Sequence, residues 1–404
     1  MPAPKISVTD SSFRNAYQLA EAASEAGGLS RFYCSLDDAS GFWGRLLRNV
    51  AGKGATVNCG GGHRLCGEVR EYPWPMVRKR LGDRFIRGPK PDWFDANDRF
   101  DRWSAAQLAS DACELLIGTE TCAEHSLKAA RSLGKRSLLD CPQFHPKYLW
   151  ELLAEAAERC ALPPPGPIDS PRMAQRKEVE FHSADSLLVY SEAHALSFER
   201  AGFDRARIHV HALWFDPRMW PVASAPRPRT PGVLKVLFVG AASLRKGIPF
   251  LLQAVRACAP RVKLTLAGPI EDSMMPLITA HSDWCEAVGP QSKQALQHLY
   301  AAHDLLAMPS VADAYGLVAM EAMACGTPAL VSHQCGVPVP EPSWRVPSND
   351  AEALRQRFEH YLQSPDLIET DGAQAAEFAK RFTAEHFRAE MRECYRQILG
   401  KTSL

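Results

Sequence analysis

Two carboxylates and a glycine lie at a spacing that could bind a sugar carried on a diphosphate. Asp313 and Glu321 are eight positions apart, and Gly316 lies between them in a turn before a short Ala- and Met-rich segment. The segment predicts a helix in which Glu321 shares a face with Leu317, one turn earlier. The first turn of a helix leaves backbone N–H groups free for an anion. A sugar hydroxyl on Glu321 would also satisfy a carboxylate that is costly to bury alone.

A pair of basic residues follows another predicted strand. The stretch Leu234–Gly240 is a short apolar run that ends in glycine, and Arg245 and Lys246 come just before a helical pattern that begins at Ile248. Cations are disfavoured at a helix N-terminus unless an anion binds there. The pair therefore predicts further anion ligands, which would stabilise the charge that a leaving diphosphate gains. A solvated Arg-Lys pair is the alternative.

The residues from Asp313 to Pro328 resemble the donor-site signature of retaining glycosyltransferases of family 4. That signature usually reads Glu-x-Phe-Gly-x4-Glu-Ala-Met-Ala-x-Gly-x-Pro, so here Asp313 replaces the first Glu and Tyr315 replaces Phe. A second family pattern, Gly-Arg-Leu-x3-Lys-Gly, matches the loop after Gly240 except that Ala241 replaces the Arg. A helix-entry turn with an incidental Asp and a surface Glu is the alternative interpretation.

The resemblance implies a role for each of these side chains. Lys246 and Arg245 would bind the diphosphate of a nucleotide sugar, Glu321 would hold the ribose, and Asp313 would hydrogen-bond the transferred sugar. The donor-binding residues that it implies are Gly240, Arg245, Lys246, Tyr315, Gly316, Leu317 and Val318. The nucleotide sugar would be a substrate, with no tightly bound cofactor and no metal.

A histidine in the first half is a third catalytic candidate beside Asp313 and Glu321. His145 follows the predicted strand Lys135–Asp140. Loops beyond the carboxyl ends of such strands are where functional residues gather. Some relatives in the family carry a His in this loop that is directed at the donor sugar, so the resemblance implies that role for His145. An ordinary surface histidine is the alternative, and His125, in another loop that ends a strand, is a second candidate.

Strand and helix patterns alternate along most of the chain, which predicts parallel sheets and two doubly wound α/β domains. We expect a first domain at 1–222, a Pro-rich linker at 223–232, a second domain at 233–380 and a C-terminal helix at 381–404 that packs back on the first domain. That helix belongs to an amphipathic pattern over Ala375–Leu399. The resemblance implies two Rossmann-like domains that face each other across a cleft, the architecture named GT-B.

Composition sets further bounds. A chain of 404 residues is too long for one ordinary core, and a net charge of +1 gives no overall attraction for nucleic acid. No run of eighteen apolar residues and no signal-peptide stretch appear, and the twelve cysteines include no Cys-x-x-Cys, so we expect reduced thiols in the cytoplasm. The basic segment 77–90 predicts either a solvated helix or a peripheral contact with the inner face of an anionic membrane.

Together these patterns predict a retaining glycosyltransferase that transfers sugar from a nucleotide-sugar donor to an unidentified acceptor, in polysaccharide or glycoconjugate synthesis. The sequence has no Asp-x-Asp, which argues against a diphosphate held through a divalent metal. Three alternatives stay open: a nucleotide-sugar epimerase of the same fold, a non-catalytic nucleotide-sugar-binding protein, and a nicotinamide-dependent oxidoreductase. The last needs a glycine fingerprint that is absent here.

Overall fold

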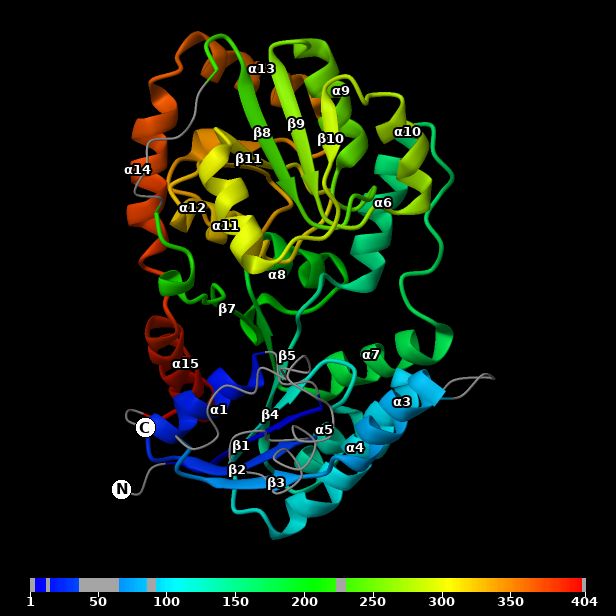
Figure 1. Ribbon diagram of the computed structural model, residues 1–404. Helices are drawn as coiled ribbons and strands as arrows, with labels where there is room; N and C mark the ends of the chain where they lie inside the picture. Colours follow the sequence, from blue (N-terminus) through cyan, green and yellow to red (C-terminus); the bar gives the residue numbers. More distant parts are fainter. Residues whose placement is uncertain (1–3, 12–14, 36–64, 86–91, 223–229, 402–404) are drawn as a thin grey trace.

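The computed structural model describes residues 4–11, 15–35, 65–85, 92–222 and 230–401. Part of the predicted linker, residues 223–229, and part of the basic segment, residues 86–90, lie outside the described residues. The chain forms two α/β domains, one above the other in Figure 1, and each contains one parallel sheet. The predicted fold class is therefore confirmed.

The first sheet has seven strands in the order β3-β2-β1-β4-β5-β6-β7, and every pairing is parallel. Its strands are β1 (Ile6–Asp10), β2 (Leu29–Cys34), β3 (Glu68–Glu71), β4 (Leu115–Thr119), β5 (Arg136–Asp140), β6 (Ser186–Val189) and β7 (Ile208–Val210). Its helices are α1 (Ala16–Glu25), α3 (Trp74–Phe85), α4 (Trp93–Gln107), α5 (Glu124–Ser132), α6 (Pro146–Arg159), α7 (Pro171–Ser183) and α8 (Glu192–Arg200). The central strands are apolar runs because helices cover both faces of the sheet.

The second sheet has six strands in the order β10-β9-β8-β11-β12-β13, also parallel. Its strands are β8 (Leu234–Val239), β9 (Val262–Ala267), β10 (Cys285–Ala287), β11 (Leu305–Met308), β12 (Ala329–Ser332) and β13 (Arg345–Val346). The helices that follow in the chain are α9 (Ile248–Cys258), α10 (Met275–Thr279), α11 (Lys293–Ala302), α12 (Leu317–Ala324), α13 (Ala351–Gln363), α14 (Leu367–Ala379) and α15 (Ala384–Leu399).

The strand order determines where a ligand can bind. In the second sheet the chain runs outward from β8 to β9 and β10, and then returns to the other side of β8 as β11. In open α/β sheets ligands usually bind in a crevice at the carboxyl edge beside such a reversal of the strand order, here between β8 and β11. The corresponding point of the first sheet lies between β1 and β4.

The C-terminal amphipathic pattern forms two helices rather than one. The predicted helical stretch Ala375–Leu399 is interrupted between α14 and α15, where the Thr383 hydroxyl accepts a hydrogen bond from the His386 N–H and so caps the start of α15. Helix α15 lies against α1 of the first domain (Figure 1). Arg388 forms an ion pair of 2.7 Å with Glu25 there, and the Tyr395 hydroxyl donates to the Leu19 carbonyl.

Helix α6 comes from the first half of the chain but shares a core with the second domain. Phe144, Leu149 and Leu153 belong to one buried apolar cluster with Val311 and Ala312 of the loop after β11. This shared core fixes the edge of the first domain against the loop that carries the predicted donor site. Among the described helices, none combines the length and the apolar character needed to cross a membrane.

Candidate functional site

The loops after β8 and β11 pack directly against each other at the crevice between these strands. The Val311 N–H donates to the Arg245 carbonyl at 2.8 Å, and Arg245 Nε donates to the Ala312 carbonyl at 3.1 Å. Gly247 allows this close approach, because it has φ of +74° and a Cβ there would lie 2.0 Å from the Pro309 carbonyl oxygen. One of the five N–H donors of the Arg245 side chain is thus bonded to the loop after β11, and the others can still reach a ligand.

The structure joins two of the predicted site residues across the two loops. Lys246 Nζ lies 2.5 Å from Asp313 Oδ2, although the residues are 67 positions apart. The side chains keep 24% and 13% of their exposure, so this ion pair is reached from the crevice. An anion bound here would compete with Asp313 for the ammonium group or share it.

Gly316 begins the helix that the sequence predicted. It has φ of +90°, and a Cβ there would lie 2.7 Å from Cys335 Sγ, so the turn accepts only glycine without strain. The Ala319 N–H in the first turn of α12 donates to the Gly316 carbonyl at 3.0 Å, whereas the N–H groups of Leu317 and Val318 have no partner within the helix. Leu317, at the first helical position, is exposed, and Val318 is partly exposed, so this turn is accessible.

Glu321 carries a carboxylate that the protein itself only partly satisfies. The Tyr300 hydroxyl of α11 donates to Oε2 at 3.2 Å, and among the described residues no Lys, Arg or His forms an ion pair with it. Burial raises the pKa of Glu321 to about 7, an effect that the Tyr300 hydrogen bond and the charge of Lys293 reduce. Such a costly group is typical of a binding site rather than of a stabilising core.

His145 does not take the position that the resemblance implied. It caps α6 through Nδ1, which accepts from the Lys147 N–H at 3.4 Å, and its ring packs against Phe181, Phe198 and Phe203. Only 3% of the residue is exposed, and burial lowers its pKa to about 4. The structure therefore gives His145 a capping and packing role, with a neutral ring that is closed to a sugar in this conformation.

The second histidine candidate is also engaged within the first domain. His125 Nε2 lies 2.9 Å from Asp98 Oδ1, and the His125 N–H donates to Asp101, so the residue ties the start of α5 to α4. These contacts within the first domain account for the position of His125, and no ligand is needed to explain it.

Tyr315 and Gly240 have structural roles beside the donor position. The Tyr315 side chain is buried, and its hydroxyl donates at 2.8 Å to the Leu213 carbonyl in the segment that leaves the first domain. Tyr315 replaces the usual phenylalanine of the signature, and its hydroxyl could have indicated this contact. Gly240 ends β8 with φ of +140°, and a Cβ on Gly268 would lie 2.0 Å from its carbonyl oxygen, so two adjacent strand ends meet there.

Two contributions to this region were missed by the sequence reasoning. Tyr300 contacts Glu321 from another helix, and nothing in the local sequence around Tyr300 marks it. Ser191 caps α8 of the first domain and also donates to the Ala314 carbonyl at 3.1 Å, so it joins the domains beside the donor loop. Among the described residues, no group of three or more His, Cys, Asp or Glu side chains is arranged to hold a metal ion.

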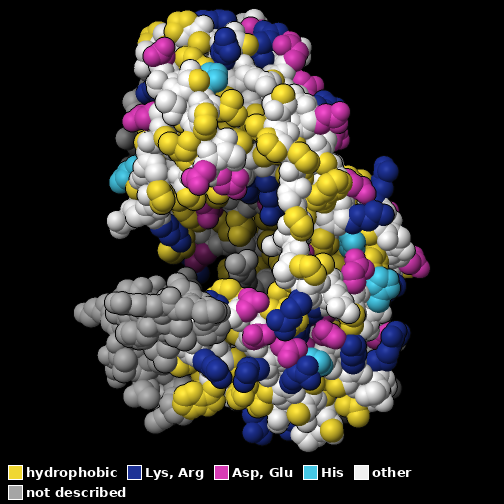
Figure 2. All heavy atoms as spheres, turned by 90° about the vertical axis from the view of Figure 1, so that its right-hand side faces the viewer, with side chains coloured by type: hydrophobic (Ala, Val, Ile, Leu, Met, Phe, Trp, Pro, Cys, Tyr) yellow, Lys and Arg dark blue, Asp and Glu magenta, His cyan; other side chains and the backbone are white. Residues whose placement is uncertain are grey.

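The two domains face each other across a deep hollow in the surface, visible in Figure 2. Two Rossmann-like domains that enclose such a cleft define the GT-B class of fold. The HepE protein of Anabaena in complex with UDP shares this fold, with a TM-score of 0.61, 16% identity and coverage of 97% of this chain and 100% of that one. So does sucrose-phosphate synthase from Thermosynechococcus elongatus, with a TM-score of 0.64, 20% identity and coverage of 98% and 99%.

The second domain can be assigned more specifically. Residues 234–364 match the family model of glycosyl transferases group 1. D-inositol 3-phosphate glycosyltransferase of Rhodococcus erythropolis is 31% identical over 232 residues, which are 51% of this chain and 52% of that protein. The chain spans about half the length of these curated relatives.

Proposed function

We propose that the protein is a glycosyltransferase that takes a sugar from a nucleotide-sugar donor bound at the crevice between β8 and β11. The observation that carries this proposal is the arrangement around α12. The first turn of α12 is accessible, Asp313 just before this helix pairs with Lys246, and Glu321 within the helix carries an under-satisfied carboxylate. The group 1 glycosyl transferase match over the same residues supports it.

Each group has a defined task in this proposal. The N–H groups of Leu317 and Val318 and the ammonium of Lys246 would bind the diphosphate and stabilise the negative charge that it gains as the glycosidic bond breaks. Glu321 accepts hydrogen bonds from the ribose hydroxyls, which supply the partners that its carboxylate lacks. Closure of the two domains would exclude water and limit hydrolysis of the donor.

We also propose a retaining course and a reaction without a metal ion. Asp313 already pairs with Lys246, so we propose that it positions the transferred sugar and does not attack it. The diphosphate would then leave, and the acceptor would attack, on the same face of the sugar, so that the configuration of the sugar is retained. Lys246, Arg245 and the start of α12 would carry out the charge neutralisation that a divalent metal performs in other transferases. The solved HepE complexes, whose ligands are UDP and UDP-glucose, support uridine as the first base to test.

The test is release of UDP from a panel of uridine-linked sugars, with and without a mixture of hydroxyl acceptors. Lys246→Ala and Glu321→Ala should each lower the rate of transfer by about tenfold or more, the loss expected when a transition-state contact is removed. Wild-type rates in both variants would contradict the site. Conversion of the donor sugar to its epimer, without any acceptor product, would favour the epimerase alternative, and binding without turnover would favour a sensor.

A further inference from the structure

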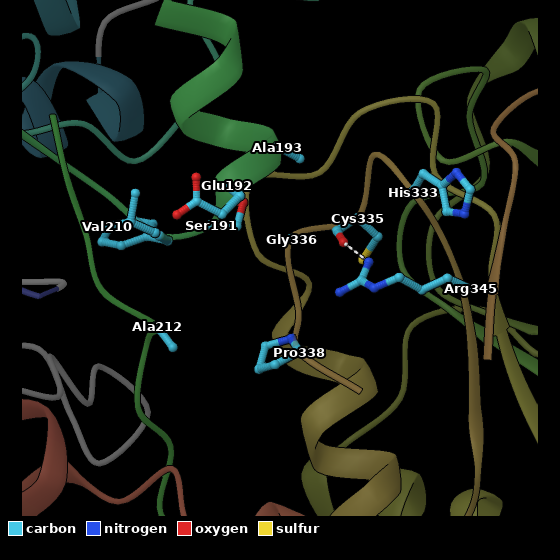
Figure 3. A pocket seen from close by; sticks show the side chains of 11 residues that line it. Ser191, Glu192, Ala193, Val210, Ala212, His333, Cys335, Gly336, Pro338 and Arg345 are labelled. Atoms are coloured by element: carbon cyan, nitrogen blue, oxygen red, sulfur yellow. Dashed lines mark hydrogen bonds between the residues drawn. The ribbon is translucent and has the colours of Figure 1, made fainter. Parts of the chain in front are cut away.

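A cavity lies between the domains, beside the loop that follows β12. It has a volume of about 480 Å³. Glu192, Val210 and Ala212 line it from the first domain, and His333, Pro338 and Arg345 line it from the second. Figure 3 shows the two groups of side chains on opposite walls. The volume is in the range of small-molecule sites and far above the share of a single water or ion.

Arg345 brings a positive charge to the wall of this cavity. Arg345 Nη1 donates to the Cys335 carbonyl at 2.8 Å and to the Ser332 carbonyl at 3.3 Å, and Nη2 donates to the Val337 carbonyl. Among the described residues, no carboxylate pairs with this guanidinium. These three bonds leave two of the five N–H donors of Arg345 for a ligand.

The acidic residue in the opposite wall does not supply the missing charge. Both Glu192 carboxylate oxygens accept from Arg205 Nη2, at 3.2 and 3.3 Å, so an arginine already pairs with this group. His333 is exposed and also lines the cavity, on the same wall as Arg345 (Figure 3). Apolar and small residues, Val210, Ala212 and Pro338, make up much of the remaining wall.

We propose that this cavity binds a small organic phosphate, with the phosphate on Arg345 and His333 and the carbon body against Val210 and Ala212. A guanidinium pairs with two phosphate oxygens at once, which is the geometry that an unbalanced arginine fits best. The apolar walls and the volume require a ligand larger than free phosphate. This site is additional to the proposed donor site, because Lys246 and the start of α12 do not line it.

The cavity is physically linked to the donor loop. The Asp313 N–H donates to the Gln334 carbonyl at 3.0 Å, and the Gly336 N–H donates to the Asp313 carbonyl at 2.9 Å. Gly336 also packs so closely that a Cβ there would lie 2.0 Å from the Ala314 carbonyl oxygen. A ligand that contacts this loop from one domain and Val210 and Ala212 from the other holds the two domains at a fixed separation.

Isothermal titration calorimetry with glycerol 3-phosphate, glucose 6-phosphate and glucose 1-phosphate tests the proposal, with inorganic phosphate and glucose as reference probes. At least one organic phosphate should bind the wild-type chain more tightly than inorganic phosphate, and glucose should not bind. Ala212→Asp should weaken that binding about tenfold or more, because it places a carboxylate in the cavity that repels the phosphate and competes for Arg345. Ala212→Ser, the matched neutral variant, should retain it.

A further variant separates this site from the donor site. Lys246→Ala should retain the binding of the organic phosphate, whereas Arg345→Lys should weaken it, since lysine lacks the planar fork. Ala212→Asp keeps the hydrogen bonds of Arg345 to its loop, so it remains informative if Arg345→Lys disturbs folding. The proposal is overturned if no organic phosphate binds more tightly than inorganic phosphate, or if binding is lost in Lys246→Ala and kept in Ala212→Asp.

Discussion

Replacing Glu321 by Gln should stabilise the protein at alkaline pH while it weakens donor binding. Burial raises the pKa of this carboxyl from 4.5 to about 7 in the folded chain. The folded state therefore holds the proton more tightly than the unfolded state does. The contribution of this carboxyl to the free energy of unfolding is fully present below pH 4.5. It is lost as the pH rises through 7, because folding must then bury a charged group. Glutamine keeps the shape and can still accept from the Tyr300 hydroxyl without a charge.

The size of the effect follows from the two pKa values. Each pKa unit corresponds to about 1.4 kcal/mol. The change from 4.5 to about 7 therefore lowers the free energy of unfolding by at most about 3 kcal/mol when the carboxyl is charged. Urea unfolding followed by circular dichroism at pH 5 and pH 8 measures it. Glu321→Gln should raise the free energy of unfolding by about 2–3 kcal/mol at pH 8 and by much less at pH 5. Glu286→Gln, at an exposed position of β10, is the matched control and should change little at either pH.

Glu321→Gln also tests whether the carboxylate that is costly to bury binds the donor. Its affinity for UDP should fall by about tenfold, since a neutral amide accepts the ribose hydroxyls less strongly than a carboxylate does. A gain in stability that is equal at pH 5 and pH 8 would refute the reasoning about a strained carboxylate. An unchanged affinity for UDP would refute its assignment to the donor.

Three further predictions concern the surrounding contacts. Gly316→Ala should cost about 1–3 kcal/mol of stability, seen as a lower Tm in calorimetry, because φ is +90° and Cys335 Sγ occupies the space; an unchanged Tm would show that the turn relaxes. Tyr315→Phe should cost about 1 kcal/mol in urea unfolding, through the lost hydrogen bond to Leu213, and no loss would mean that water replaces it. Arg388→Met should release α15 from α1 and speed proteolysis between α14 and α15; cleavage at the wild-type rate would contradict that role.

The central strands and the donor loops could be predicted because each is encoded locally. The apolar run that ends at Gly240 gave β8 to within one residue, and the Gly316 turn with the following helix was also found from the local sequence. Short edge strands such as β3 and β13 were not expected. β3 contains a single apolar residue and β13 is only two residues long, so neither forms an apolar run, and pairing with a neighbouring strand defines them.

Contacts between distant segments are what the sequence could not supply. Lys246 and Asp313 were each predicted as ligands, but the ion pair between them depends on two loops that only the sheet order brings together. His145 follows a strand as predicted, yet three phenylalanines from α7, α8 and the loop after α8 enclose its ring. Tyr300 and the Arg345 cavity likewise arise from tertiary packing, and no local pattern marks them.

A crystal structure of the chain with UDP bound tests the central claim most directly. We expect the diphosphate against the first turn of α12 and the Lys246 ammonium, with the ribose hydroxyls within hydrogen-bond distance of the Glu321 carboxylate. UDP bound at the carboxyl edge of the first sheet, or in the second domain but away from Glu321 and Lys246, would contradict the account.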